Sequence, residues 1–218
     1  MWLLENSLDN QAAYWDRVAE DKTFTHALNV EQFKRLVDID AAVLDFGCGY
    51  GRIGHTLYDL GYRNITGLDL SAKMVTRGRM IYPHLRLETA TPERWPGSPA
   101  SFDAVILFAV LTCIPTDSGQ ETLLEQIDSV LRPGGILYIS DYWLQADDRN
   151  LDRYRTFEEK YGIYGVFELP EGAVFRHHHR EWVCSLLSRF DTLVLEDIEV
   201  TTMNGHRSLG FQYFGRKT

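Results

Sequence analysis

Glycine and aspartate residues at fixed spacing are the part of this chain best suited to bind a ligand. An apolar run ends in Asp45, and Gly47, Gly49 and Gly51 follow at alternate positions. Glycines spaced in this way leave bare backbone, against which an adenosine-type ligand can lie in van der Waals contact. Asp45 adds a carboxylate at the same turn. The apolar run before the turn and the helical pattern after it predict a strand, a tight turn and a helix start.

Two registers of the glycines are consistent with two different ligands. The first, Gly49-x-Gly51-x-x-Gly54, satisfies the dinucleotide fingerprint, and Asp69 follows Gly49 by 20 residues, as a ribose-binding acid does. This register would indicate a nicotinamide-dependent dehydrogenase. The second register begins at Asp45, and segments farther along the chain distinguish it from the first.

The second register, Asp45-x-Gly47-x-Gly49-x-Gly51, resembles motif I of the class I S-adenosylmethionine (SAM) methyltransferases. Three more segments occur in the order typical of that family: the second strand and its acid at 67–71, the fourth strand at 101–106, and the turn into the fifth strand at 131–137. The resemblance covers roughly residues 40 to 142. It implies SAM as the cofactor and S-adenosylhomocysteine as the product.

Strand and helix patterns alternate along the chain. Strands are expected near 42–46, 64–68, 85–89, 102–107 and 135–141, and helices near 9–20, 29–37, 51–60, 72–82, 119–131 and 180–189. Such alternation predicts a parallel sheet with helices on both faces. With the resemblance, the fold class is α/β: a Rossmann-like, doubly wound sheet of seven strands, mostly parallel, with an antiparallel C-terminal hairpin strand.

The C-terminal pattern supports the methyltransferase resemblance. Two apolar runs, 192–202 and 207–214, flank Asn204-Gly205, the dipeptide preferred in two-residue type I′ hairpin turns. Class I methyltransferases end in such an antiparallel hairpin, whereas dehydrogenases usually end otherwise. The Tyr-x-x-x-Lys pair of short-chain dehydrogenases matches only Tyr213 and Lys217, at the extreme end of the chain.

The resemblance also assigns cofactor contacts. It implies that Gly47 and Gly49 pass the methionyl and adenosyl parts, that Asp45 helps to hold the methionyl ammonium, and that Asp69 accepts both ribose hydroxyls. For Asp69, capping of the next helix is the alternative. Where relatives carry an adenine-binding Asp this chain has Thr91, so contacts from Thr91 or from backbone are expected. The remaining expected cofactor contacts are Cys48, Leu70, Ala90, Leu107 and Phe108.

No residue is assigned a catalytic role from sequence, and four are candidates. His26 belongs to an aromatic N-terminal stretch, and Asp141 and Tyr142 end the fifth strand, where topology places the substrate crevice. His178, in the run 177–179, is a candidate proton acceptor because histidine titrates near neutrality. Three consecutive histidines in a strand point to alternate sides, so no metal site is expected.

Composition restricts the partners. The net charge of −9 and pI near 5.2 argue against nucleic acid, whose phosphates require clustered Lys and Arg. The longest apolar run, 104–114, is too short to span a bilayer, and no signal peptide is recognisable. The three widely spaced cysteines are consistent with free thiols in a cytoplasmic protein. We expect a monomer or homodimer without membrane partners.

The 218 residues most simply form one domain, 1–218. Within it, residues 1–40 are expected to be an N-terminal helical lid and residues 143–180 an insertion on the substrate side. The expected function is methyl transfer from SAM to a small molecule. The alternative is a SAM-binding regulatory or scaffold module without catalysis. A deep cavity beside Gly47 and Asp141 would favour the enzyme. A filled crevice with an exposed apolar patch would favour the non-catalytic module.

Overall fold

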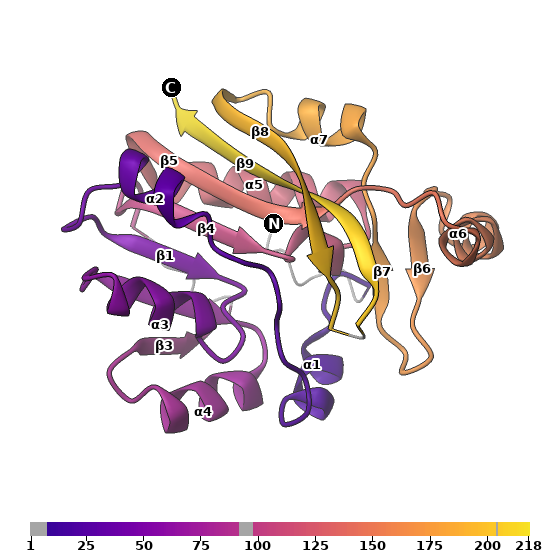
Figure 1. Cartoon of the computed structure of the whole chain (residues 1–218), viewed down its shortest axis with the longest axis horizontal. Helices are drawn as coiled ribbons and strands as arrows, with labels where there is room; N and C mark the ends of the chain where they lie inside the picture. The colour runs from indigo at the N-terminus through magenta and orange to yellow at the C-terminus, as the bar shows by residue number, and fades with distance from the viewer. Residues whose placement is uncertain (1–7, 92–97, 204) are drawn as a thin grey trace.

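A seven-stranded sheet forms the centre of the computed structural model, which describes residues 8–91, 98–203 and 205–218 (Figure 1). The strand order is β3-β2-β1-β4-β5-β9-β8, in which the first five strands are parallel and β9 is antiparallel to both its neighbours. The strands are β1 (Val43–Phe46), β2 (Ile65–Asp69), β3 (Arg86–Thr89), β4 (Phe102–Phe108), β5 (Leu131–Tyr142), β8 (Phe190–Thr201) and β9 (Arg207–Lys217). The predicted fold class is confirmed.

Helices cover both faces of the sheet because the central strands are apolar on both sides (Figure 1). Successive side chains of β4 alternate between two cores: Val105 and Leu107 face one, Ala104 and Ile106 the other. The first core is completed by α5 (Asp117–Val130) and α7 (Arg180–Leu186), and the second by α2 (Val30–Leu36) and α3 (Arg52–Asp59).

The helices beside the glycine turn start at defined caps. Helix α3 begins after Gly51, whose φ of +86° is in the left-handed region that glycine tolerates. Helix α4 (Ala72–Ile81) is capped by Ser71, whose hydroxyl accepts from the Met74 amide at 3.0 Å. Helix α1 (Ala12–Val18) is tied to α4 through Asp16, which accepts from the Ser71 hydroxyl at 2.6 Å.

The segment after β5 contains a helix that the sequence pattern does not predict. Helix α6 (Asp148–Tyr161) is followed by a small hairpin of β6 (Val166–Glu168) and β7 (Val174–Arg176), all beyond the end of β5 (Figure 1). Only Asn150 and Tyr154 of α6 are buried, so the helix lacks the broad apolar stripe by which periodicity is recognised.

The C-terminal hairpin is present, but its turn differs from the predicted two-residue turn. The Thr202 amide donates to the His206 carbonyl and the Gly205 amide to the Thr202 carbonyl, both at 2.8 Å, so three residues separate the closing pair. Gly205 has φ +80°, as three-residue hairpin loops require. The other half of the predicted dipeptide, Asn204, lies outside the described residues.

Among the described residues, no helix combines the length and apolar character needed to cross a bilayer.

Candidate functional site

A deep cavity opens at the carboxyl ends of the parallel strands. Its wall includes Gly47 after β1, Asp69 at the end of β2, Phe108 at the end of β4 and Tyr142 at the end of β5. The empty space measures about 1570 Å³, including the mouth that is open to solvent. In parallel α/β sheets this edge is where ligands bind.

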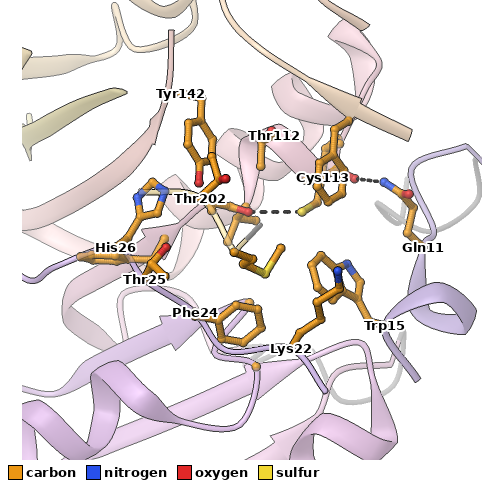
Figure 2. Close-up of a pocket in the computed structure, with 18 of the residues that line it drawn as sticks. Gln11, Trp15, Lys22, Phe24, Thr25, His26, Thr112, Cys113, Tyr142 and Thr202 are labelled. Carbon is orange, nitrogen blue, oxygen red and sulfur yellow. Dashed lines mark hydrogen bonds between the residues drawn. The ribbon is translucent and has the colours of Figure 1, made fainter. Parts of the chain in front are cut away.

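The N-terminal segment forms one wall of the cavity. Trp15, Phe24, Thr25 and His26 line it, and Figure 2 shows His26 beside Tyr142, with Trp15 farther along towards Cys113. Gln11 fixes this segment, since its Nε2 donates to the carbonyls of Cys113 (2.8 Å) and Val174 (2.6 Å).

The lid expected over residues 1–40 therefore differs in extent from what the structure shows. Helix α2 packs against the sheet through Phe33 and lines no part of the cavity. Residues 1–7 lie outside the described residues, and the described residues of this segment that line the cavity fall between 9 and 26.

The glycine turn makes room for the protein's own side chains. Gly47 and Gly49 have φ of +71° and +56°, in the left-handed region. A Cβ on Gly47 would lie 2.5 Å from Val110 Cγ2, and one on Gly49 would lie 2.2 Å from Phe24 Cε2. Both glycines line the cavity, and Phe24 lies over Gly49, with its ring stacked on that of Tyr50 at a centroid distance of 5.2 Å.

Asp69 supports the turn and also lines the cavity. Its Oδ2 accepts from the Gly49 amide at 2.7 Å and its Oδ1 from the Ser71 amide at 2.8 Å. Burial raises the pKa of Asp69 to about 6, while the two amide bonds act in the opposite direction. Ser71, not Asp69, caps α4.

Asp45 is a second buried carboxyl group in the wall. Burial raises its pKa to about 7, and the nearby charge of Arg52 and an amide bond from Gly54 partly offset this rise. Arg52 lines the cavity too and donates to the carbonyl of His26, whereas its Nε is buried without a partner. Cys48 and Leu70, two of the residues predicted to contact the cofactor, also line the cavity.

At the end of β4, alternation separates Leu107 from the cavity. Leu107 is fully buried in the core formed with α5, and Phe108 faces the cavity. Contrary to expectation, Leu107 therefore does not line the cavity. Ala109, next along the wall, has φ +53°, a strained conformation for a residue with a Cβ, and such strain is concentrated at functional sites.

The residues expected at the adenine do not line the cavity. Ala90 is buried, and its amide donates to the carbonyl of Asp69 at 2.8 Å, so this amide is not free for a ligand. Thr91 is half-buried and precedes 92–97, which lie outside the described residues.

Of the four catalytic candidates, His26 and Tyr142 line the cavity. The His26 Nδ1 lies 2.9 Å from Ser140 Oγ, and its Nε2 is buried without a hydrogen-bond partner. Burial and then the charge of Arg52 lower the pKa of His26 to about 4, so the ring is neutral at physiological pH. The ring of Tyr142 packs edge-on against His26, with centroids 4.7 Å apart.

Asp141 and His178 lie behind the wall. Asp141 accepts from the amides of Thr112 and Tyr142 at 3.2 and 2.8 Å, and burial raises its pKa to about 7. His178 accepts from Gln120 Nε2 at 2.9 Å, and its Nδ1 lies 3.0 Å from the carbonyl of Tyr142. Because their polar atoms serve internal bonds, neither is placed to contact a ligand directly.

The consecutive histidines point in different directions. His177 lines the cavity and bonds the Tyr154 hydroxyl at 2.5 Å, His178 faces Gln120, and His179 is exposed. Across the described ranges, no cluster of His, Cys, Asp and Glu is suited to a metal ion.

Several lining residues carry no recognisable sequence signal. Thr202, Met203, His206 and Ser208 reach the cavity from the C-terminal hairpin, although the sequence of that hairpin is informative only about the fold. A further group, Arg149 and Arg153, comes from α6. Both sets lie far along the chain from the glycine turn, and only the tertiary fold brings them to it.

Comparison with known proteins agrees with the motifs. A family model described as a methyltransferase domain matches residues 43–135. A ubiquinone biosynthesis O-methyltransferase of Xanthomonas euvesicatoria is 29% identical over 150 residues, 62% of this chain and 60% of its own length. A demethylmenaquinone methyltransferase of Beutenbergia cavernae is 28% identical over 172 residues, 74% of this chain and 67% of its own. The chain thus spans about three fifths to two thirds of these relatives.

A solved structure shares the fold. A SAM-dependent methyltransferase from Methanosarcina mazei superposes with a TM-score of 0.80 at 21% identity, covering 88% of this chain and 98% of that one. The chain is therefore similar to methyltransferases in sequence over residues 43–135, and it shares its fold with a SAM-dependent methyltransferase. These similarities favour the register that begins at Asp45 over the dinucleotide register.

Proposed function

We propose that this chain transfers the methyl group of SAM to a small-molecule acceptor. The observation that supports transfer is the continuity of one cavity from the glycine turn and Asp69, past His26 and Tyr142, to an aromatic wall. A filled crevice, expected of a non-catalytic module, is not observed. The exposed large apolar side chains of the described residues are few: Ile39, Met80, Ile81 and Leu209.

The polar groups of the cavity suit SAM. Asp45 and Asp69 are carboxyl groups whose pKa values are raised by burial, and additional positive charge nearby would favour their ionised forms. A ligand that brings an ammonium, a sulfonium and ribose hydroxyls supplies that charge and the hydroxyl donors. The buried, unpartnered Nε of Arg52 is a donor suited to a methionyl carboxylate. When bound, SAM supplies a methyl group on positively charged sulfur, already activated for attack.

The acceptor side supports a planar, largely apolar molecule. Aromatic side chains dominate this part of the wall: Trp15, Phe108, Tyr142, Phe167 and Phe175. Aromatic acceptors are consistent with the quinone pathways named for the two relatives. We propose that His26 accepts the proton of an acceptor hydroxyl or amine at its free Nε2 while Ser140 holds the ring. A weakly basic imidazole suffices, because the acceptor atom becomes strongly acidic as the methyl group attaches.

The proposed function is tested by incubating the purified protein with methyl-labelled SAM and a panel of hydroxylated and amino-substituted aromatic compounds. We expect label in at least one acceptor, with an equal amount of S-adenosylhomocysteine formed. Tight S-adenosylhomocysteine binding without transfer to any acceptor would favour the non-catalytic module instead.

SAM affinity should depend on pH through the two buried carboxyl groups. Their pKa values of about 7 and about 6 mean that both hold protons in mildly acidic solution. A cationic ligand binds the ionised forms, so affinity must rise with pH and level off above neutrality. If SAM binds only when both groups are ionised, its affinity increases about 100-fold between about pH 5.5 and 7.5. Calorimetric titration across this range tests it, and a flat affinity would contradict the assignment of both groups.

Removing the charge of Asp69 tests the ribose contact. Asp69→Asn keeps an oxygen for one of the supporting amides and loses the charged acceptor for hydroxyls, so S-adenosylhomocysteine should bind about 10- to 100-fold more weakly. The control is Asp40→Asn at an exposed position. If the two variants bind S-adenosylhomocysteine with equal affinity, Asp69 does not belong to the binding site.

A further inference from the structure

The far part of the cavity carries positive charge. Arg149 and Arg153, one turn apart on α6, both line it. In sheet order β5, which leads into α6, is three strands from β2, which ends in Asp69. The carboxyl groups that suit the cofactor and the guanidinium groups of α6 therefore belong to different parts of one cavity.

Arg153 is held against an aromatic ring and has no carboxylate partner. Its Cζ lies 3.4 Å from the ring centroid of Phe167, and its Nε is buried without a hydrogen bond. Among the described residues, no carboxylate oxygen lies within 4.0 Å of the Arg153 guanidinium. Burial, and then the charge of Arg149, lower the pKa of Arg153, and Tyr154 and Asp147 offset this lowering only in part.

The acidic groups nearby are engaged elsewhere. Asp147 accepts from the Asn150 amide at 3.2 Å and lies 3.8 Å from Nε of the exposed Arg149. Asp152 lies 3.7 Å from Arg155. Asp9, an acid that lines the cavity, accepts from the Thr116 amide and hydroxyl at 3.1 and 2.7 Å.

We infer that the methyl acceptor carries a carboxylate, which Arg153 binds with the assistance of Arg149. A guanidinium fork matches a carboxylate in planar geometry, and Phe167 fixes the plane of that fork. The aromatic walls then hold the body of the acceptor between Arg153 and the free nitrogen of His26. The acceptor class is a hydroxylated or amino-substituted aromatic carboxylate. This inference rests on the proposed methyl transfer.

The test compares 3,4-dihydroxybenzoate with its amide, 3,4-dihydroxybenzamide, on protein saturated with S-adenosylhomocysteine. Dissociation constants are measured by NMR titration for the wild type and for Arg153→Gln, Arg153→Lys and Arg155→Gln. Arg155 is the matched control because it lies on the same helix, 69% exposed in its side chain, and lines no part of the cavity.

The wild type should bind the acid at least about tenfold more tightly than the amide, as hydrogen bonds to a charged group require. Arg153→Gln should remove this preference, Arg153→Lys should retain part of it, and Arg155→Gln should leave it unchanged. Equal binding of acid and amide, undetectable acid binding, or a preference that survives Arg153→Gln would overturn the inference. Failure to saturate with S-adenosylhomocysteine would instead contradict the proposed cofactor site.

Discussion

His26→Gln should slow methyl transfer by about 100- to 10,000-fold and leave S-adenosylhomocysteine affinity within about twofold of the wild type. The reason is that Nε2 of His26 is a buried nitrogen in the cavity wall without any partner, whereas Nδ1 is held 2.9 Å from Ser140 Oγ. Glutamine retains a polar side chain of similar length but no basic nitrogen. The measurement is the single-turnover rate with labelled SAM and an acceptor found in the panel.

The matched control for His26 is His84→Gln, since His84 is exposed and outside the cavity lining. Ser140→Ala separates positioning from proton transfer: it should reduce the rate less than His26→Gln does, because the imidazole remains. Equal transfer rates in the His26 and His84 variants would exclude His26 as the proton acceptor.

Gly49→Ala should weaken S-adenosylhomocysteine binding by more than about 100-fold. Two costs add at this position: a left-handed backbone, φ +56°, of about 1–2 kcal/mol for a residue with a Cβ, and overpacking of about 1–3 kcal/mol. The overpacking arises because the new Cβ would lie 2.2 Å from Phe24 Cε2. The turn or Phe24 must move, and both line the cofactor part of the cavity.

A double-mutant cycle separates the two costs. When Phe24→Ala is added to Gly49→Ala, the loss of S-adenosylhomocysteine affinity that is due to the clash should be recovered. The loss that is due to the left-handed backbone should remain. Gly134→Ala provides the control for backbone strain alone, since Gly134 has φ +78° and a Cβ there meets nothing within 4 Å. If the Gly49→Ala variant binds S-adenosylhomocysteine as tightly as the Gly134→Ala variant does, Phe24 does not lie over the turn in solution.

The sheet and the glycine turn could be predicted because their signals are local. Strand runs and helix periodicity recur in order, and motif spacing places Asp45, Gly47 and Asp69 at neighbouring strand ends. An error of one residue in a predicted strand end changes which side chain is expected to line the cavity, because successive side chains face opposite sides of the sheet. For this reason Leu107 proved to be core while Phe108 lines the cavity.

The acceptor side could not be predicted because it is assembled from distant segments. Gln11 bonds the backbone at Val174, 163 residues away, and Arg153 comes from a helix with almost no buried face. Topology places Asp141 correctly at the crevice edge, but its carboxylate turns inward to the amides of Thr112 and Tyr142. Such choices depend on tertiary hydrogen bonding, which leaves no periodic trace in the sequence.

The central claim, that the cavity at the glycine turn binds SAM, is tested most directly by calorimetric titration of the purified protein with S-adenosylhomocysteine, with NADH as the control. We predict one site with micromolar affinity for S-adenosylhomocysteine and no heat of binding with NADH. Binding of NADH without S-adenosylhomocysteine would contradict the assignment of the cavity to SAM.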